Sequence, residues 1–264
     1  MEWWWAYLGI GVMAGFLAGL LGVGGGTLIV PMLVFVFSAK GFPVEHMMHL
    51  SLATAMAAVV FTSVTSVITH HRHGAVDWRV VRAMAPGMVA GALAATMVAG
   101  FVPTRPLAAF FTVFMLYAAT QMFFNVKPKA ARRLPGSAGL FGVGAGIGAL
   151  SSVLAAGGAF LSIPFLTRCN FPLKRALGTA AANGFPIAVA GTIGYVLNGL
   201  RVSGLPEGSL GFVYLPALAM IVVASMPTAP IGARLAHRLP VRRLRAVFSL
   251  LLLALALRML VNLW

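Results

Sequence analysis

Long apolar runs separated by short polar gaps fill this sequence from one end to the other. The runs lie at residues 5–21, 27–37, 47–69, 83–102, 107–125, 138–154, 159–167, 176–197, 211–231 and 246–263. A helix needs about 20 apolar residues to cross a bilayer, and most of these runs reach or approach that length. Because only 9% of the residues are charged and 60% are hydrophobic, a soluble domain is excluded. We therefore expect an all-α polytopic membrane protein.

A glycine-rich stretch, residues 22–27 (GVGGGT), interrupts the first apolar segment, and a weaker copy, residues 155–159 (AAGGA), interrupts the second half. The runs that follow, 27–37 and 159–167, are too short to cross a membrane alone. Each is expected to be the returning arm of a helical hairpin whose tip lies inside the membrane. Irregular backbone is tolerated there only where protein or an aqueous cavity satisfies its amides, so both breaks are candidate solute sites.

The order of these features repeats along the chain. Each half contains a break, a proline in the short run, a Phe-Pro pair, a small-residue segment around a threonine and two further prolines: Pro31, Phe42-Pro43, Thr54, Pro86 and Pro103 in the first half, and Pro164, Phe171-Pro172, Thr179, Pro216 and Pro240 in the second. This order predicts two homologous halves, each a broken hairpin plus three transmembrane helices. Residues 1–126 would form the first repeat, 127–136 a basic cytoplasmic linker, and 137–264 the second repeat.

The distribution of Lys and Arg predicts the orientation of the halves. If the linker is cytoplasmic and each hairpin returns to the side from which it entered, the basic loops 70–82, 168–175 and 234–245 are also cytoplasmic. If each hairpin were a single crossing, the second half would invert and its most basic loop would lie outside. The positive-inside rule therefore predicts inverted repeats with both termini outside the cytoplasm.

The two breaks should expose backbone amides where a new short helix starts, and opposed hairpins would bring their tips together near the midplane. Free amides and the positive end of a helix dipole favour an anion. Two threonines occupy equivalent places in the helices after the hairpins, although such hydroxyls often bond their own helix instead. Our candidate substrate-binding residues are Gly24, Gly25, Gly26, Thr27, Thr54, Gly157, Gly158, Thr179 and Asn183.

The four acidic residues lie in loops or near the termini, at Glu2, Glu45, Asp77 and Glu207. No carboxylate is therefore expected at the membrane midplane, which disfavours cation substrates and carboxylate-based proton or sodium relays. No serine or cysteine is placed to form a nucleophile–base pair inside the membrane, so we do not expect an enzyme. The glycine-rich stretch lacks the strand and the Lys-Ser/Thr of a nucleotide-binding loop, and we expect no cofactor.

The formal net charge of +15 does not indicate a nucleic-acid partner, because the basic residues lie in short gaps between apolar runs. Positive loops of a membrane protein account for it better. The tract 70–73 (HHRH) resembles a metal-binding tract in composition, but its place at a helix end favours a solvated loop. We expect no metal site there.

Residues 15–26 (GFLAGLLGVGGG), continuing to 31–33 (PML), are similar to the first-repeat motif of the TauE/SafE family of membrane permeases. Residues 177–180 (LGTA) resemble its recurring Gly-Thr element, and the likeness extends over essentially the whole chain. The resemblance implies a bacterial inner-membrane transporter of sulfite, sulfoacetate or related small anions. The chain departs from the pattern at Ala155, Ala156 and Ala159, where glycines are expected.

These observations together predict a permease that moves a small anion, a sulfur oxyanion or organosulfonate, by alternating access between inverted halves. Its expected partners are the anionic solute and the lipid bilayer, and the sequence leaves open whether it forms a homo-oligomer. Two alternatives remain at this point. One is a passive anion channel on the same scaffold, and the other is a membrane accessory subunit that does not transport.

Overall fold

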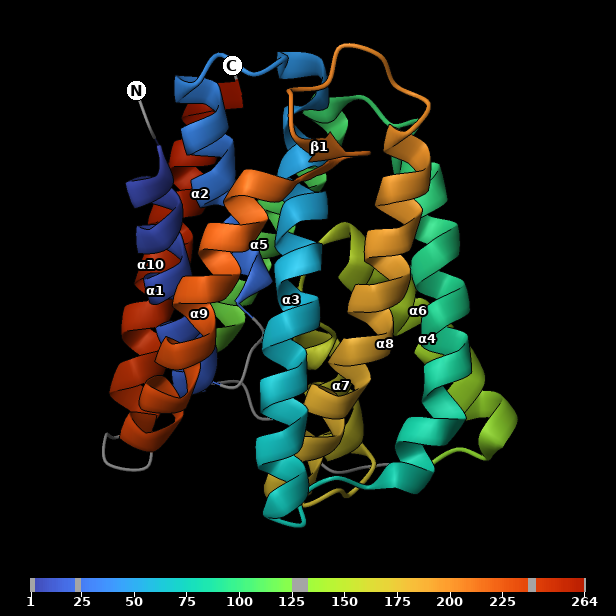
Figure 1. Ribbon diagram of the computed structural model, residues 1–264. Helices are drawn as coiled ribbons and strands as arrows, with labels where there is room; N and C mark the ends of the chain where they lie inside the picture. Colours follow the sequence, from blue (N-terminus) through green and yellow to red (C-terminus); the bar gives the residue numbers. More distant parts are fainter. Residues whose placement is uncertain (1–2, 22–24, 125–132, 237–240, 264) are drawn as a thin grey trace.

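The computed structural model describes residues 3–21, 25–124, 133–236 and 241–263, and nearly all of them are helical (Figure 1). The helices are α1 (Trp4–Leu21), α2 (Gly26–Ala39), α3 (Met47–Arg72), α4 (Trp78–Ala99), α5 (Thr104–Phe123), α6 (Ser137–Val153), α7 (Ala159–Arg168), α8 (Leu173–Gly199), α9 (Leu215–Ala236) and α10 (Val241–Leu263). Each expected apolar run therefore forms one helix. A short 3-10 helix, η1 (Val44–His46), precedes α3.

The short helices α2 and α7 each return toward the end of the bundle from which the preceding helix entered (Figure 1). Helix α1 descends from the upper end and α2 rises back to it, whereas α6 rises from the lower end and α7 descends again. The chain starts and finishes at the upper end, while α5 ends and α6 begins at the lower end. The broken hairpins therefore enter from opposite ends of the bundle.

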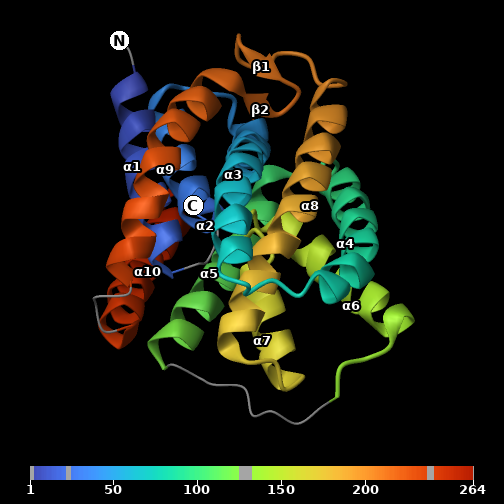
Figure 2. The ribbon, with the colours of Figure 1, turned by 60° about the horizontal axis from the view of Figure 1, so that its bottom comes forward.

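Helices from different halves form the closest pairs. Helix α1 packs along α9 and α4 packs along α6, while α3 and α8 lie side by side at the centre (Figures 1 and 2). Glycines permit this close approach: a methyl group added at Gly144 or Gly11 would meet the backbone of Met84 or Ile221. Small residues let helix backbones approach where lipid supplies no hydrophobic driving force.

A two-stranded antiparallel hairpin, β1 (Ser209–Leu210) and β2 (Val213–Tyr214), occupies the upper end just before α9. The expected run 211–231 therefore begins as a strand and loop, and its helix starts only at Leu215. The reason is local, because Gly208 and Gly211 have φ angles of 83° and 54°, which end regular helix. In addition, Gly211 lies directly against the backbone of Val196 in α8.

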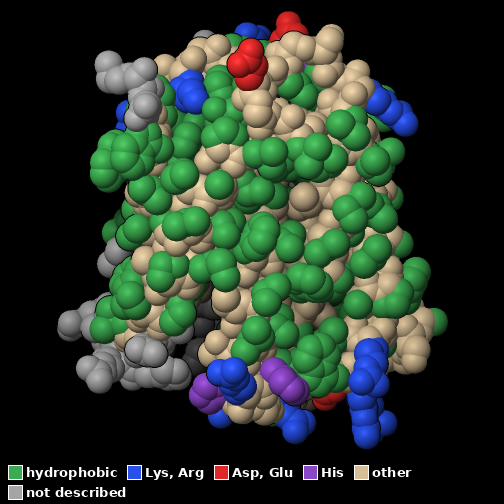
Figure 3. Space-filling model, in the orientation of Figure 1, with side chains coloured by type: hydrophobic (Ala, Val, Ile, Leu, Met, Phe, Trp, Pro, Cys, Tyr) green, Lys and Arg blue, Asp and Glu red, His purple; other side chains and the backbone are tan. Residues whose placement is uncertain are grey.

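On the face shown in Figure 3, the surface between the two ends is an apolar belt, with Lys, Arg, Asp, Glu and His side chains gathered above and below it. Among the described residues, five helices are long and apolar enough to span a membrane: Val44–Arg72, Trp78–Ala99, Thr104–Phe123, Leu173–Gly199 and Leu215–Gly232. Shorter apolar helices include both arms of the first hairpin. The all-α polytopic membrane fold expected from the sequence is thus confirmed.

Candidate solute site at the hairpin tips

The two glycine-rich breaks adopt different backbone conformations. Gly25 caps α2 in a right-handed conformation, and its carbonyl accepts bonds of 3.1 Å from the amides of Leu28 and Ile29. In the second break Gly157 and Gly158 have φ angles of 58° and 76°. Glycine reaches such angles readily, and Gly158 thereby starts α7. Gly24, also expected at the site, lies outside the described residues.

Alanine at position 155 adopts a left-handed conformation as well, with φ of 47°. This conformation costs a residue with a Cβ atom roughly 1–2 kcal/mol. The alanine that replaces an expected glycine therefore keeps the break but strains it.

The structure brings the two breaks into contact. Gly26 lies against the carbonyl group of Ala155, and a methyl group added at Gly26 would also lie 2.9 Å from Cγ2 of Val59 in α3. Both residues are fully buried. Tips from the two halves of the chain therefore meet beside α3 inside the bundle.

Thr54 and Thr179, the two threonines expected at the site, each accept a hydrogen bond from a backbone amide in the other half of the chain. The hydroxyl of Thr54 accepts a 3.0 Å bond from the amide of Tyr214, directly before α9. The hydroxyl of Thr179 accepts a 3.0 Å bond from the amide of Asp77, directly before α4. Both side chains are fully buried, so each ties a central helix to the start of a helix from the other half.

Four buried polar side chains in or near the breaks retain atoms without a hydrogen-bond partner in the described part of the chain. They are Thr27, Ser151, Ser162 and Asn183. Thr27 and Asn183 were expected from the sequence, whereas Ser151 and Ser162 flank the second break and were missed. The amide nitrogen of Asn183 makes only a 3.8 Å contact to the sulfur of Met84. Buried polar groups are normally paired, so such a group points to water or a ligand.

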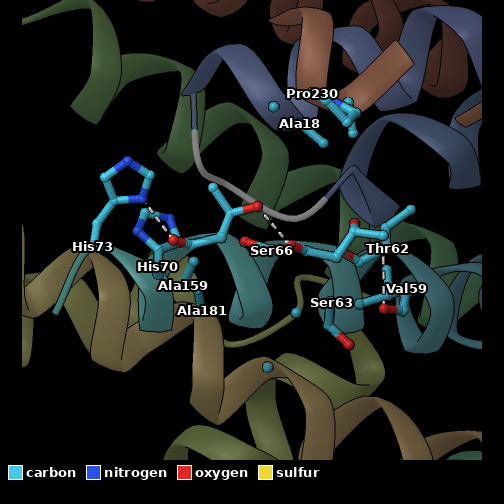
Figure 4. A pocket seen from close by; sticks show the side chains of 16 residues that line it. Ala18, Val59, Thr62, Ser63, Ser66, His70, His73, Ala159, Ala181 and Pro230 are labelled. Carbon is cyan, nitrogen blue, oxygen red and sulfur yellow. Dashed lines mark hydrogen bonds between the residues drawn. The ribbon is translucent and has the colours of Figure 1, made fainter. Parts of the chain in front are cut away.

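A cavity of about 440 Å³ extends from the second break toward the lower end of α3 (Figure 4). Its walls come from α1, α3, α8, α9 and the second break, and they include Ala18, Gly19, Val59, Thr62, Ser63, Thr65, Ser66, Thr69, His70, His73, Gly157, Ala159, Ala181, Gly184, Ala229 and Pro230. Ala18 and Pro230 lie across the cavity from α3. Because His73 is exposed, the cavity reaches the surface at that end.

One face of α3 supplies the polar lining. Thr62, Ser66, Thr69 and His73 follow helical spacing, which places them on one stripe. Thr62 and Thr69 donate their hydroxyl protons to carbonyls of their own helix at 3.3 and 2.9 Å. Rotating such a hydroxyl toward a solute forfeits one bond, which costs about 0.5–1.5 kcal/mol. The stripe can therefore donate to a solute at modest cost.

His70 and His73, at the end of α3 where the sequence predicts a solvated segment, also line this cavity. Nδ1 of His73 lies 2.7 Å from the carbonyl oxygen of Thr69, which can only accept, so that nitrogen carries a proton. The other ring nitrogen, Nε2, is then free to accept a hydrogen bond from a solute in the cavity. The helical spacing of hydroxyls and histidines was visible in the sequence and could have identified this wall.

The cavity walls include hydroxyls, imidazoles and backbone, with no Asp or Glu among the described lining residues. Likewise, no group of three or more His, Cys, Asp or Glu that could hold a metal ion occurs within the described ranges. The hydroxyls of the described lining can therefore donate hydrogen bonds to a solute.

Comparison with known proteins gives a consistent result. The family described as Sulfite exporter TauE/SafE matches residues 7–259, a span that contains both breaks. A probable membrane transporter protein of Haemophilus influenzae is 33% identical over 95% of both chains. Another from Methanocaldococcus jannaschii is 23% identical over 92% of this chain and 90% of its own. The Bacillus subtilis probable membrane transporter protein YdhB is 24% identical over 86% and 88%. No solved structure gives a significant match.

Proposed function

The chain belongs to the sulfite exporter TauE/SafE family, and we propose that it carries a small anion, such as sulfite or sulfoacetate, across the membrane. The observation that carries this proposal is the 440 Å³ cavity, which is lined by hydroxyls and imidazoles and reaches the second break, and the second break contacts the first break at Gly26. Cavities of about 300–1,000 Å³ accommodate small-molecule ligands. A small sulfonate with part of its hydration shell fits that range.

In this proposal the anion binds at the inner end of the cavity. Helix α7 starts there and α2 starts beside it, where Gly26 meets Ala155, and the first amides and dipoles of both helices favour negative charge. Amides of Gly24, Gly25, Gly26, Gly157 and Gly158 would surround the solute, with hydroxyl donors from Thr27, Ser151 and Ser162 and the amide nitrogen of Asn183, which would turn from the sulfur of Met84 to the solute. Thr54 and Thr179 would position the helices instead, because their hydroxyls already accept backbone bonds.

We further propose that residues 1–126 and 137–264 are inverted repeats joined by the linker 127–136. Two reciprocal features support this. Helix α1 pairs with α9 as α6 pairs with α4, and Thr54 bonds the start of α9 as Thr179 bonds the start of α4. Such a scaffold suits alternating access to a central site. By the positive-inside rule, the lower end in Figure 1 would face the cytoplasm of a bacterial cell and both termini would lie outside.

The test is uptake of radiolabelled sulfite and sulfoacetate into proteoliposomes. Asn183→Leu and Gly158→Leu should reduce transport at least tenfold, an estimate based on losing one ligand bond of about 1.5–3 kcal/mol to a charged group. The matched control is Gly9→Leu in α1, because Gly9 has no atoms within 4 Å of an added methyl group. Unchanged transport in both site variants would refute the proposed site.

The same vesicles separate the remaining alternatives. Saturable uptake accelerated by unlabelled anion on the opposite side identifies a carrier, since counterflow requires alternating exposure of a site. Linear flux without counterflow would instead identify a passive channel. Absence of flux for every anion tested would favour a non-transporting accessory subunit.

A further inference from the structure

Helices α3 and α8 carry corresponding residues at corresponding positions. Thr54 and Thr179 make equivalent bonds to the opposite half, and they set the register between the two helices. Counting equally from each threonine pairs the cavity residues Thr69, His70 and His73 with Gly194, Tyr195 and Asn198. The upper part of α8 is therefore the counterpart of the cavity wall on α3.

The facing walls correspond in the same way. Tyr214 and Asp77 donate the two equivalent bonds, so they set the register between α9 and α4. Counting from them pairs the cavity residues Ala229 and Pro230 of α9 with Ala92 and Leu93 of α4. The seam between the upper parts of α4 and α8 is thus the counterpart of the cavity between α3 and α9.

This seam is closed where the cavity is open. Gly194 lies against the side chain of Thr96, and a methyl group added there would be 2.9 Å from Cβ of Thr96. The amide nitrogen of Asn198 donates to the carbonyl oxygens of Thr96 at 2.8 Å and Met97 at 3.4 Å. Thr96 and Tyr195 are fully buried and Asn198 is 6% exposed, whereas His73, the counterpart of Asn198, is exposed.

We propose that the α4–α8 seam is a closed second vestibule and that Asn198 is the latch that holds it shut. This inference rests on the proposed alternating access between inverted halves. When the latch releases, α4 and α8 separate at the upper end as α3 and α9 are separated at the lower end. The site at the hairpin tips then becomes accessible from the upper side.

The surface that would be uncovered has the chemistry of a solute path. The hydroxyl of Tyr195 has no hydrogen-bond partner among the described residues although it is fully buried. Ser152 of α6, beside the second break, donates a 3.4 Å bond to the carbonyl of Ala92 in α4, one wall of the seam. Together with the freed amide of Asn198 these groups supply neutral donors, which suits the small anion proposed for the other side.

Thiol labelling in lipid nanodiscs tests the latch without requiring transport. The buried native cysteine is first replaced, Cys169→Ala, and single reporters are then introduced as Thr96→Cys in the seam or Ser66→Cys in the cavity. In the otherwise unaltered background, a polar maleimide should label the cavity reporter quickly and the seam reporter slowly. Adding Asn198→Ala should accelerate labelling of the seam reporter about tenfold and slow labelling of the cavity reporter, as expected for loss of about 1.4 kcal/mol of hydrogen bonding.

Two further variants keep the test decisive. Gly194→Ala should have the same effect as Asn198→Ala by a different route, because it pushes the helices apart and leaves the amide intact. Thr112→Ala is the matched control, since this buried hydroxyl bonds only its own helix, at Ala108. Faster labelling of both reporters together would mean general loosening and would overturn the latch, as would an unchanged seam reporter. If the reporters exchange reactivity but no anion is transported, the proposed function fails and the latch stands.

Discussion

Contact between the two hairpin tips makes Gly26→Ala a sharp probe of this fold. The added methyl group would meet the carbonyl oxygen of Ala155, lie 3.1 Å from its carbonyl carbon and lie 2.9 Å from Cγ2 of Val59. Ordinary contacts of this kind are 3.4–4 Å. Since a backbone carbonyl cannot rotate away as a side chain can, we expect a cost in the upper part of the overpacking range, about 2–3 kcal/mol.

For a chain of this size each kcal/mol corresponds to roughly 2–4 °C in the unfolding midpoint, so Gly26→Ala should lower it by about 4–12 °C. Cys169 gives the assay directly, because it is the one cysteine in the sequence and is buried. A dye that fluoresces on reaction with a thiol therefore reports unfolding of the detergent-solubilised protein on heating.

Gly9→Ala is the control for this measurement. It lies within α1, where an added methyl group has nothing within 4 Å, and replacing glycine in a helix gains up to about 1 kcal/mol. Its midpoint should be unchanged or higher. A Gly26→Ala midpoint equal to that of Gly9→Ala would refute the direct contact between the breaks.

The other predictions concern single groups. Asn183→Leu should hold or raise the unfolding midpoint while abolishing anion uptake, because it removes a buried oxygen without a partner in the described chain; a large fall in the midpoint would contradict this. Thr54→Val and Thr179→Val should each destabilise by about 1–3 kcal/mol, since the first leaves the buried amide of Tyr214 unpaired and the second the half-buried amide of Asp77; thermal unfolding compares them. Gly148→Ala should destabilise the fold by about 1–3 kcal/mol, because the added methyl group would meet the backbone of Met88. The matched control is Gly146→Ala in the same helix, where an added methyl group has no atom within 4 Å.

Local signals explain why so much of the fold followed from the sequence. Each apolar run became one helix because a bilayer helix satisfies its own backbone, so run length and glycine breaks suffice to place it. The second break also follows from local chemistry, since Gly157 and Gly158 supply the positive φ angles that start α7. The β-hairpin before α9 was missed because its strands are only two residues each and the second lies within an apolar run.

The sequence by itself determined the membrane class, the order of the helices and the two breaks that organise them. Only the tertiary structure decided that Thr54 and Thr179 bond the starts of α9 and α4, and that the cavity follows the hydroxyl face of α3. The physical reason is that helix faces toward lipid and toward protein are both apolar here, so periodicity cannot tell them apart. Which helices meet, and which polar groups find partners, depends on contacts between residues far apart in the chain.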